Sequence, residues 1–246
     1  MDRDAHSMCF ELGGAARLWG VLTRQFHSTR GVPDLDDVAA SIHTRTLHSP
    51  GTALIILENT HNRAGGAVIP LSAHRSVQAL AREHGVKVHI DGARIFNAAV
   101  ASGVSARDYA ACADSISFCL SKGMGCPAGS LLCGSREFIE RARRLRKLLG
   151  GGMRQAGVLA ACGLIALESM IGRLAEDHAK ARRLAEGIRD IPGVRVDLAT
   201  VQTNMVYVHT QAPAAQVRAN LQEEGVLCNA TAEHSLRFVT HMDVSS

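Results

Sequence analysis

The chain has 246 residues, of which 46% are hydrophobic and 20% are charged, with 27 Lys and Arg against 23 Asp and Glu. This apolar content excludes a disordered chain and predicts a large folded core with room for a smaller second domain. The net charge of +4 is low for a nucleic-acid-binding protein and disfavours that class. No apolar run approaches the roughly 20 residues of a membrane span, and the first residues do not show the pattern of a secretory signal.

The seven cysteines are an odd number, which favours free thiols in a reducing compartment and predicts a cytoplasmic protein. Cys112, Cys119, Cys126 and Cys133 follow one another at intervals of seven residues, but Pro127 and several glycines interrupt that stretch. Zinc sites favour closer pairs of cysteines. We therefore expect no metal site here, and expect these cysteines to serve as small buried hydrophobic residues.

Strands and helices alternate in the first part of the chain. The continuous apolar run at 53–57 is typical of a strand buried on both faces, as in a parallel sheet. Apolar runs predict further strands at 86–90 and 116–120, and helical spacing predicts helices at 72–83, 135–149 and 155–170. Together they predict a mostly parallel sheet with helices on both faces.

The pattern changes near Gly172. A helix is predicted at 173–188, short strands at 194–196, 204–208 and 236–239, and a further helix at 214–224. This predicts an α/β protein with a large domain over residues 1–171 and a smaller α+β domain over residues 172–246.

Polar residues that could bind a ligand or take part in catalysis follow the predicted parallel strands. Such sheets bind ligands at the ends of these strands. Lys122 follows the strand at 116–120 and is either a solvent-facing loop residue or an amine held for attack on a carbonyl. Asp91 follows the strand at 86–90 and is either a helix or turn cap or a carboxylate facing a ligand cation. A lysine and an acid in these positions suggest pyridoxal phosphate (PLP), which needs a Schiff-base lysine and an acidic partner for its ring nitrogen.

Six segments of the chain resemble those of the L-threonine aldolases, in the same order and with similar spacing over nearly the whole length. These segments are Leu57-Glu58-Asn59-Thr60-His61-Asn62, His89-Ile90-Asp91-Gly92-Ala93-Arg94, Cys119-Leu120-Ser121-Lys122-Gly123, Gly150-Gly151-Gly152-Met153-Arg154-Gln155, Glu176-Asp177-His178 and Arg237-Phe238-Val239-Thr240-His241-Met242-Asp243.

The resemblance implies a PLP-dependent transferase of fold type I, with an aspartate aminotransferase-like large domain. It implies that Lys122 holds the cofactor and that Asp91 pairs with the ring nitrogen. His6 matches a histidine that stacks on the cofactor ring, and Arg94 matches an arginine at the cofactor and substrate. The family forms dimers and tetramers, so we expect a homo-oligomer and neither a nucleic-acid nor a membrane partner.

The implied reaction is cleavage of L-threonine or L-allo-threonine, between Cα and Cβ, to glycine and acetaldehyde. By the same resemblance Arg94 and Arg237 bind the substrate carboxylate, a task that suits the planar guanidinium. Arg154 lies in a glycine-rich turn near the site. His61, or a water it orients, takes the hydroxyl proton.

Other interpretations of these residues remain open. Away from the family, His61 is typical of a loop histidine bonded to backbone and Arg237 of a surface strand residue. His241 and Asp243 lack a third metal ligand in the sequence, which favours a structural role. The basic helix at 135–149 favours a solvated face or a subunit contact over nucleic-acid binding.

Relatives in the family carry an N-terminal arm and a phosphate-binding turn before the segment that resembles Asp4-Ala5-His6, and a closing helix beyond the last segment. We therefore expect a chain trimmed at both ends, with an incomplete fold. The alternative to an active enzyme is a non-catalytic truncated isoform or a pseudogene product that keeps the core but binds PLP poorly.

Overall fold

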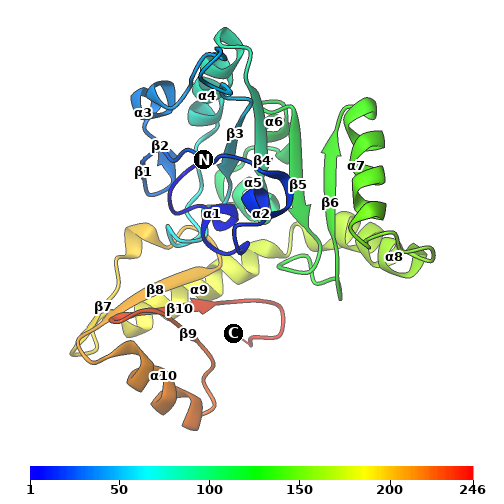
Figure 1. Ribbon diagram of the computed structural model, residues 1–246. Helices are drawn as coiled ribbons and strands as arrows, with labels where there is room; N and C mark the ends of the chain where they lie inside the picture. The colour runs from blue at the N-terminus through cyan, green and yellow to red at the C-terminus, as the bar shows by residue number, and fades with distance from the viewer. Residues whose placement is uncertain (246) are drawn as a thin grey trace.

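A four-stranded sheet in the order β3-β4-β5-β6 forms the centre of the upper part of the molecule (Figure 1). The structure is a computed structural model, which describes residues 1–245. Strands β3 (Leu54–Glu58), β4 (Lys87–Asp91) and β5 (Ser115–Cys119) are parallel, and β6 (Ser130–Gly134) pairs with β5 in the antiparallel direction. The predicted mostly parallel sheet is therefore confirmed, while β6 was absent from the prediction.

The parallel strands are buried because helices cover their apolar side chains. Helices α4 (Leu71–Glu83), α5 (Ile95–Ser102) and α6 (Ala106–Ala110) supply apolar residues to the main hydrophobic cluster. In that cluster Leu57 and Ile90 of the strands pack with Val77 of α4 and Tyr109 of α6. Burying such side chains contributes roughly 25 cal/mol per Å² of apolar surface, so this cluster is the main source of stability for the sheet.

The segment that precedes β3 is made of short elements. They are α1 (His6–Cys9), α2 (Gly14–Trp19), the β1–β2 hairpin (Ser28–Thr29 and Val32–Pro33) and α3 (Leu35–Ala40). Asp34 caps α3 by accepting hydrogen bonds from the backbone N–H groups of Asp36 and Asp37. A parallel bridge between Asp2 and Phe26 holds the first residues against this segment.

A second sheet, in the order β7-β8-β10-β9, has only antiparallel pairs (Figure 1). Its strands are β7 (Val194–Arg195), β8 (Met205–Thr210), β9 (Asn229–Ala232) and β10 (Ser235–Val239). Helices α9 (Leu174–Ile188) and α10 (Ala214–Glu223) pack on it, and the short helix η2 (Leu198–Thr200) follows β7. This sheet has its own hydrophobic cluster, which includes Val206 and Leu236. The division at residues 171 and 172 stays a prediction.

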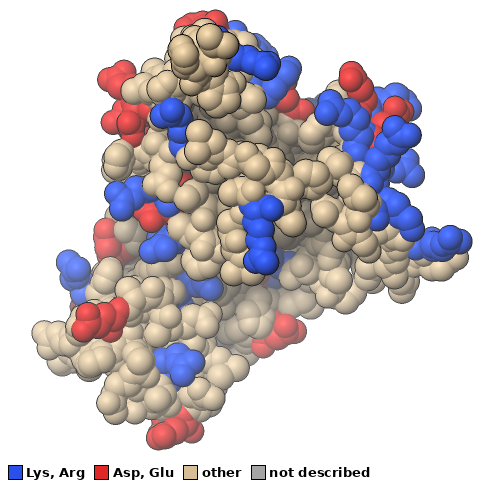
Figure 2. Space-filling model, viewed as in Figure 1, with Lys and Arg blue, Asp and Glu red and all other residues tan. Residues whose placement is uncertain are grey.

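Beyond β6, helices α7 (Arg136–Leu148) and α8 (Gly157–Ile165) form an outer edge that is both basic and apolar. Figure 2 shows Lys and Arg gathered along α7. All five residues of β6 are exposed, and Leu132, Phe138, Leu145 and Leu164 are exposed large apolar side chains on these elements. This edge therefore combines charged residues with an unusual amount of exposed apolar surface.

The predicted helix at 155–170 ends in a π-helical turn, η1 (Ala166–Met170), instead of continuing as α-helix. Within residues 1–245 no single helix has the length and apolar character of a membrane span; the bent pair Gly157–Met170 and Leu174–Ile188, with a 68° bend, meets that test only jointly.

His74 on α4 makes the stability of the fold depend on pH. The residue is fully buried, and its Nε2 lies 3.1 Å from Nδ2 of Asn59. Burial lowers the pKa of His74 from 6.5 to about 4. Its contribution to stability is therefore fully present above pH 6.5 and is lost as the pH falls toward about 4, by about 3 kcal/mol.

We predict that the free energy of unfolding, measured by urea denaturation, falls between pH 6.5 and 4 and that His74→Gln makes this fall smaller. A remaining slope is expected because burial also lowers the pKa values of His89 and His178. The same slope in His74→Gln and in the parent chain would contradict the prediction.

Candidate active site

The ends of the three parallel strands meet at one edge of the sheet. Glu58 at the end of β3 is in register with Asp91 at the end of β4, and Asp91 is in register with Ser117 of β5. The backbone N–H of Asn59 donates to the carbonyl of Asp91 at 2.9 Å. The segments that follow the strands therefore open onto the same edge, as the parallel arrangement requires.

Asp91 is held at this edge by a turn that needs glycine. A Cβ atom at Gly92 would lie 2.8 Å from the carbonyl oxygen of Ser117, to which the Gly92 N–H donates. Only glycine allows the two backbones to approach so closely. Asp91 Oδ1 accepts a hydrogen bond from the N–H of Ala93 at 3.1 Å. That bond fixes one oxygen of the half-buried carboxylate and leaves the other for a ligand.

Lys122 lies in the turn that follows β5. The carbonyl of Lys122 accepts from the N–H of Gly125 at 2.9 Å, which closes the turn. A Cβ at Gly123 would lie 2.6 Å from Leu174, so the turn packs tightly against the start of α9. The side chain of Lys122 is half-buried, and no hydrogen bond or ion pair to its amine is found among residues 1–245. Its backbone is therefore fixed while its amine stays free to react.

Two arginines act on each other electrostatically, and among residues 1–245 neither forms an ion pair with a carboxylate. Arg94 precedes α5 and Arg237 belongs to β10. Burial and then the positive charge of Arg237 lower the pKa of Arg94. Arg237 donates from an Nη atom to Oδ1 of Asn62 at 3.0 Å, while its Nε is buried without a partner among the described residues. Two half-buried guanidinium groups with unused donors form a site suited to a carboxylate.

Glu58 is a buried carboxylate that holds two backbone segments together. Its oxygens accept hydrogen bonds from the N–H of His6, at 2.5 Å, and from the N–H of Asn62, at 2.7 Å. Asn62 in turn contacts Arg237, and its carbonyl accepts from the hydroxyl of Tyr207 at 3.3 Å. Glu58 therefore links the first residues of the chain to the loop that contacts the second sheet.

His61 is buried, and both of its ring nitrogens face other groups. Nδ1 accepts a hydrogen bond from the N–H of Ala64 at 3.2 Å, and Nε2 lies 3.5 Å from Oδ2 of Asp2. Burial would lower the pKa of His61, but the nearby carboxylate of Asp2, with Glu58 and Asp4, raises it overall. The geometry leaves Nδ1 as the nitrogen without a proton.

The ring of His6 and the side chain of Arg154 have other surroundings. The ring of His6 stacks on Phe10 with centroids 5.1 Å apart, and its Nε2 lies 3.1 Å from an oxygen of Glu11. Arg154 is exposed in the turn between α7 and α8, which lies beyond β6 (Figure 1). The functional roles predicted for both residues stay predictions.

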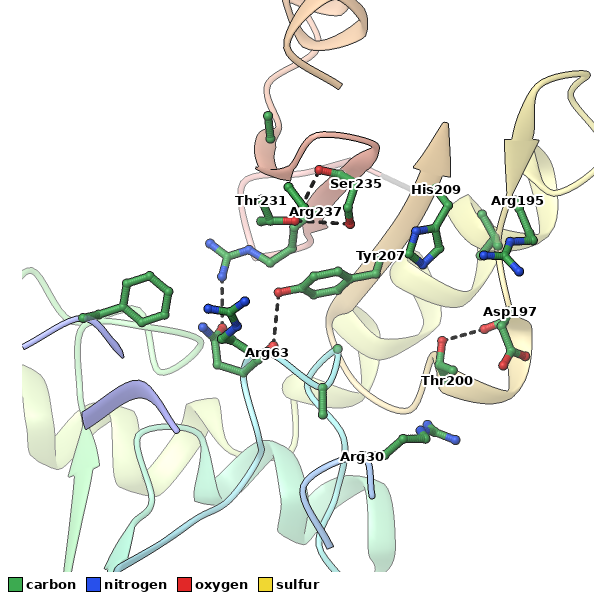
Figure 3. A pocket seen from close by; sticks show the side chains of 17 residues that line it. Arg30, Arg63, Arg195, Asp197, Thr200, Tyr207, His209, Thr231, Ser235 and Arg237 are labelled. Atoms are coloured by element: carbon green, nitrogen blue, oxygen red, sulfur yellow. Dashed lines mark hydrogen bonds between the residues drawn. The ribbon is translucent and has the colours of Figure 1, made fainter. Parts of the chain in front are cut away.

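A cavity of about 790 Å³ lies between the loop after β3 and the second sheet (Figure 3). Its lining includes Arg63, Tyr207 and Arg237, with His209 and Arg195 further along (Figure 3). Asp91 and Lys122 are outside this lining. The cavity therefore adjoins Arg237, while Arg94 is also outside its lining.

Four residues at the site have contacts that sequence reasoning missed. These residues are Asp2, Glu58, Asn62 and Tyr207. Glu58 and Asn62 are part of a segment that carries the family resemblance, which was a usable signal. Asp2 and Tyr207 reach the site only through tertiary contacts, and no local pattern marks them.

Known proteins with the same fold show the class of enzyme to which this chain is similar. The fold is that of the PLP-dependent enzymes of fold type I, and a threonine aldolase from Leishmania major superposes with a TM-score of 0.80 at 18% identity, over 99% of this chain and 72% of that one. The family model for the beta-eliminating lyases matches residues 1–211.

The chain belongs to the beta-eliminating lyase family, and within it to the threonine aldolases, which confirms the resemblance. The low-specificity L-threonine aldolase of Escherichia coli K12 is 42% identical over 98% of this chain and 71% of its own length. Low-specificity L-threonine aldolase 1 of Arabidopsis thaliana is 40% identical over 99% of this chain and 70% of its own length. The chain is thus a lyase.

We predict that Glu58→Gln lowers the free energy of unfolding by about 1–3 kcal/mol, because the amide keeps one acceptor oxygen and turns a donor toward a backbone N–H. Glu11→Gln, which alters an exposed carboxylate in the same region, is the matched control and should change stability by less than about 0.5 kcal/mol. Equal stabilities of the two variants in urea denaturation would contradict the role given to Glu58.

Proposed function

We propose that the chain is a PLP-dependent lyase that cleaves L-threonine and L-allo-threonine to glycine and acetaldehyde. The observation that carries the proposal is that Asp91, Arg94 and Lys122 follow the parallel strands, while Arg237 of the second sheet reaches the loop after β3 through its hydrogen bond to Asn62. The names of the relatives support the same reaction. No observation favours the non-catalytic alternative.

The residues present fit PLP in their donors and acceptors. Lys122 has an amine without a partner among residues 1–245, which suits covalent attachment to the cofactor aldehyde. Asp91 keeps one carboxylate oxygen free of the turn, which suits the protonated ring nitrogen. His6, whose ring stacks on Phe10 here, is proposed to stack on the cofactor ring. When bound, PLP supplies an electron sink for the bond cleavage at Cα.

The arginines orient the substrate. Arg94 and Arg237 are half-buried, so their hydrogen bonds to the substrate carboxylate form where water competes poorly. Asn62 holds one Nη atom of Arg237, which limits the rotation of the guanidinium. Two fixed points of attachment place the Cα–Cβ bond reproducibly, which is what selective cleavage of that bond needs. Arg154 is proposed as a further substrate contact.

His61 is proposed to receive the hydroxyl proton, directly or through a water. Only Nδ1 can take it, because Nε2 carries the proton that faces Asp2. Nδ1 accepts from the N–H of Ala64 in this structure, so proton uptake requires that bond to open. The proposed base is therefore coupled to the loop that follows it.

The quaternary state and compartment are also proposals. The exposed apolar residues of β6, α7 and α8 support a homo-oligomer. The seven free cysteines support a reducing compartment such as the cytoplasm.

Purified chain mixed with PLP should develop a visible-range absorption band and release glycine from threonine. Lys122→Ala should lose the band and the activity, because it removes the amine proposed to hold the cofactor. Lys147→Ala, on the exposed face of α7, is the matched control and should keep both. Folded parent chain with neither band nor glycine release would overturn the proposed function.

Replacing the carboxylate-binding arginine should affect substrate binding. We predict that Arg237→Lys raises KM for threonine by about 10–100-fold, because a lysine keeps the charge and loses the forked pair of donors. Arg218→Lys on α10, an exposed residue, should leave KM unchanged. An equal effect of the two replacements would argue against the assignment of Arg237.

A further inference from the structure

Asp2 and His61 form a buried pair at the edge of the proposed site. Their side chains are only 5% and 3% exposed, and Oδ2 of Asp2 lies 3.5 Å from Nε2 of His61. Neither of these two atoms has a hydrogen-bond partner among residues 1–245, so their closest polar contact is this ion-pair approach to each other. A buried carboxylate oxygen and a buried ring nitrogen without hydrogen-bond partners are costly, and their charges offset part of that cost when the two face each other.

The second nitrogen of the ring determines which tautomer is present. Nδ1 of His61 accepts from the backbone N–H of Ala64 at 3.2 Å, and an accepting nitrogen carries no proton. In the neutral ring the proton is therefore on Nε2, where it points at Asp2. The other oxygen of Asp2 accepts from the N–H of Asp4 at 2.7 Å, so the carboxylate is itself held in place.

Ala64 belongs to the loop that shapes the carboxylate site. Asn62 in this loop accepts from Arg237 through its side chain and from Tyr207 through its carbonyl. The loop also lines the cavity of Figure 3. The protonation state of His61 therefore affects the position of Arg237, through Ala64 and the loop that carries Asn62.

We propose that Asp2 is a positioning residue that holds His61 as the Nε2-protonated tautomer. In this form Nδ1 anchors the loop at Ala64 and so keeps Asn62 in contact with Arg237. Protonation of Nδ1 breaks the anchor, because an imidazolium cannot accept a hydrogen bond. The pair thus couples the protonation of His61 to the order of the loop.

The charges around the ring of His61 set the pH at which Nδ1 is protonated and the hydrogen bond from Ala64 is lost. Asp2, Glu58 and Asp4 are the acidic groups that act on His61, and together they raise its pKa although burial opposes them. Burial likewise would raise the pKa of Asp2, but His61 and neighbouring polar groups lower it to about 2. Asp2 therefore stays charged while His61 titrates, and removing its charge must lower the pKa of His61.

The test is NMR of the full chain labelled with ¹⁵N-histidine, with His61 assigned through His61→Gln, together with hydrogen exchange at the Ala64 amide. We expect the Nε2-protonated tautomer near neutral pH. We also expect faster Ala64 exchange, relative to its intrinsic rate, below the titration midpoint of His61. Asp2→Asn should lower the proton affinity of His61 by about tenfold or more and shift the exchange midpoint equally.

Asp4→Asn is the matched control, since it removes a half-exposed carboxylate two residues away whose charge is screened by solvent. It should shift the midpoint by much less than Asp2→Asn. The Nδ1-protonated tautomer in the parent chain would overturn the proposal even if Asp2→Asn failed to fold, and so would equal shifts in the two variants. The inference rests on the proposed function only for the role of Arg237, and these measurements need no turnover, so the two can fail separately.

Discussion

The buried carboxylate of Glu58 is the contact on which the arrangement of the site depends. It stands at the end of a buried parallel strand, where a lone negative charge would be expensive. Two backbone N–H groups satisfy it, one from His6 and one from Asn62. The carboxylate of Glu58 therefore fixes both the segment that carries His6 and the loop that contacts Arg237. We expect both segments to lose their fixed positions when this carboxylate is removed.

The electrostatics of the site follow from this placement. Glu58 acts on the charged state of both His61 and Arg94, while Arg94 and Arg237 oppose each other. Bringing two guanidinium groups together in a half-buried region costs free energy that the fold must supply elsewhere. The hydrophobic cluster around β3, β4 and α4 is the available source. A bound carboxylate would reduce the repulsion between the two guanidinium groups. The site is therefore preorganised for an anion.

Sequence patterns located the parallel strands because each is buried and therefore apolar throughout. They failed at β6, where all five residues are exposed and Leu131 and Leu132 give no alternation. The π-helical turn at Ala166–Met170 was missed for a similar reason, since its composition suits an ordinary helix. The periodicity of apolar residues indicates which faces are buried, but it does not identify exposed edge strands or irregular helical turns.

The residues that carry chemistry could be predicted by type and by place along the chain, but their contacts could not. Parallel register alone implied that Asp91 and the segment after Glu58 share an edge, and the parallel pairing of β3 with β4 confirms this. The state of His61 depends on Asp2 and Ala64, and Asp2 is far from His61 in the sequence. A histidine that is a plausible base by residue type is thus, in the fold, a hydrogen-bond acceptor that anchors a loop. Its acid–base behaviour belongs to the pair and the loop together, because moving the proton changes the contacts that hold Arg237.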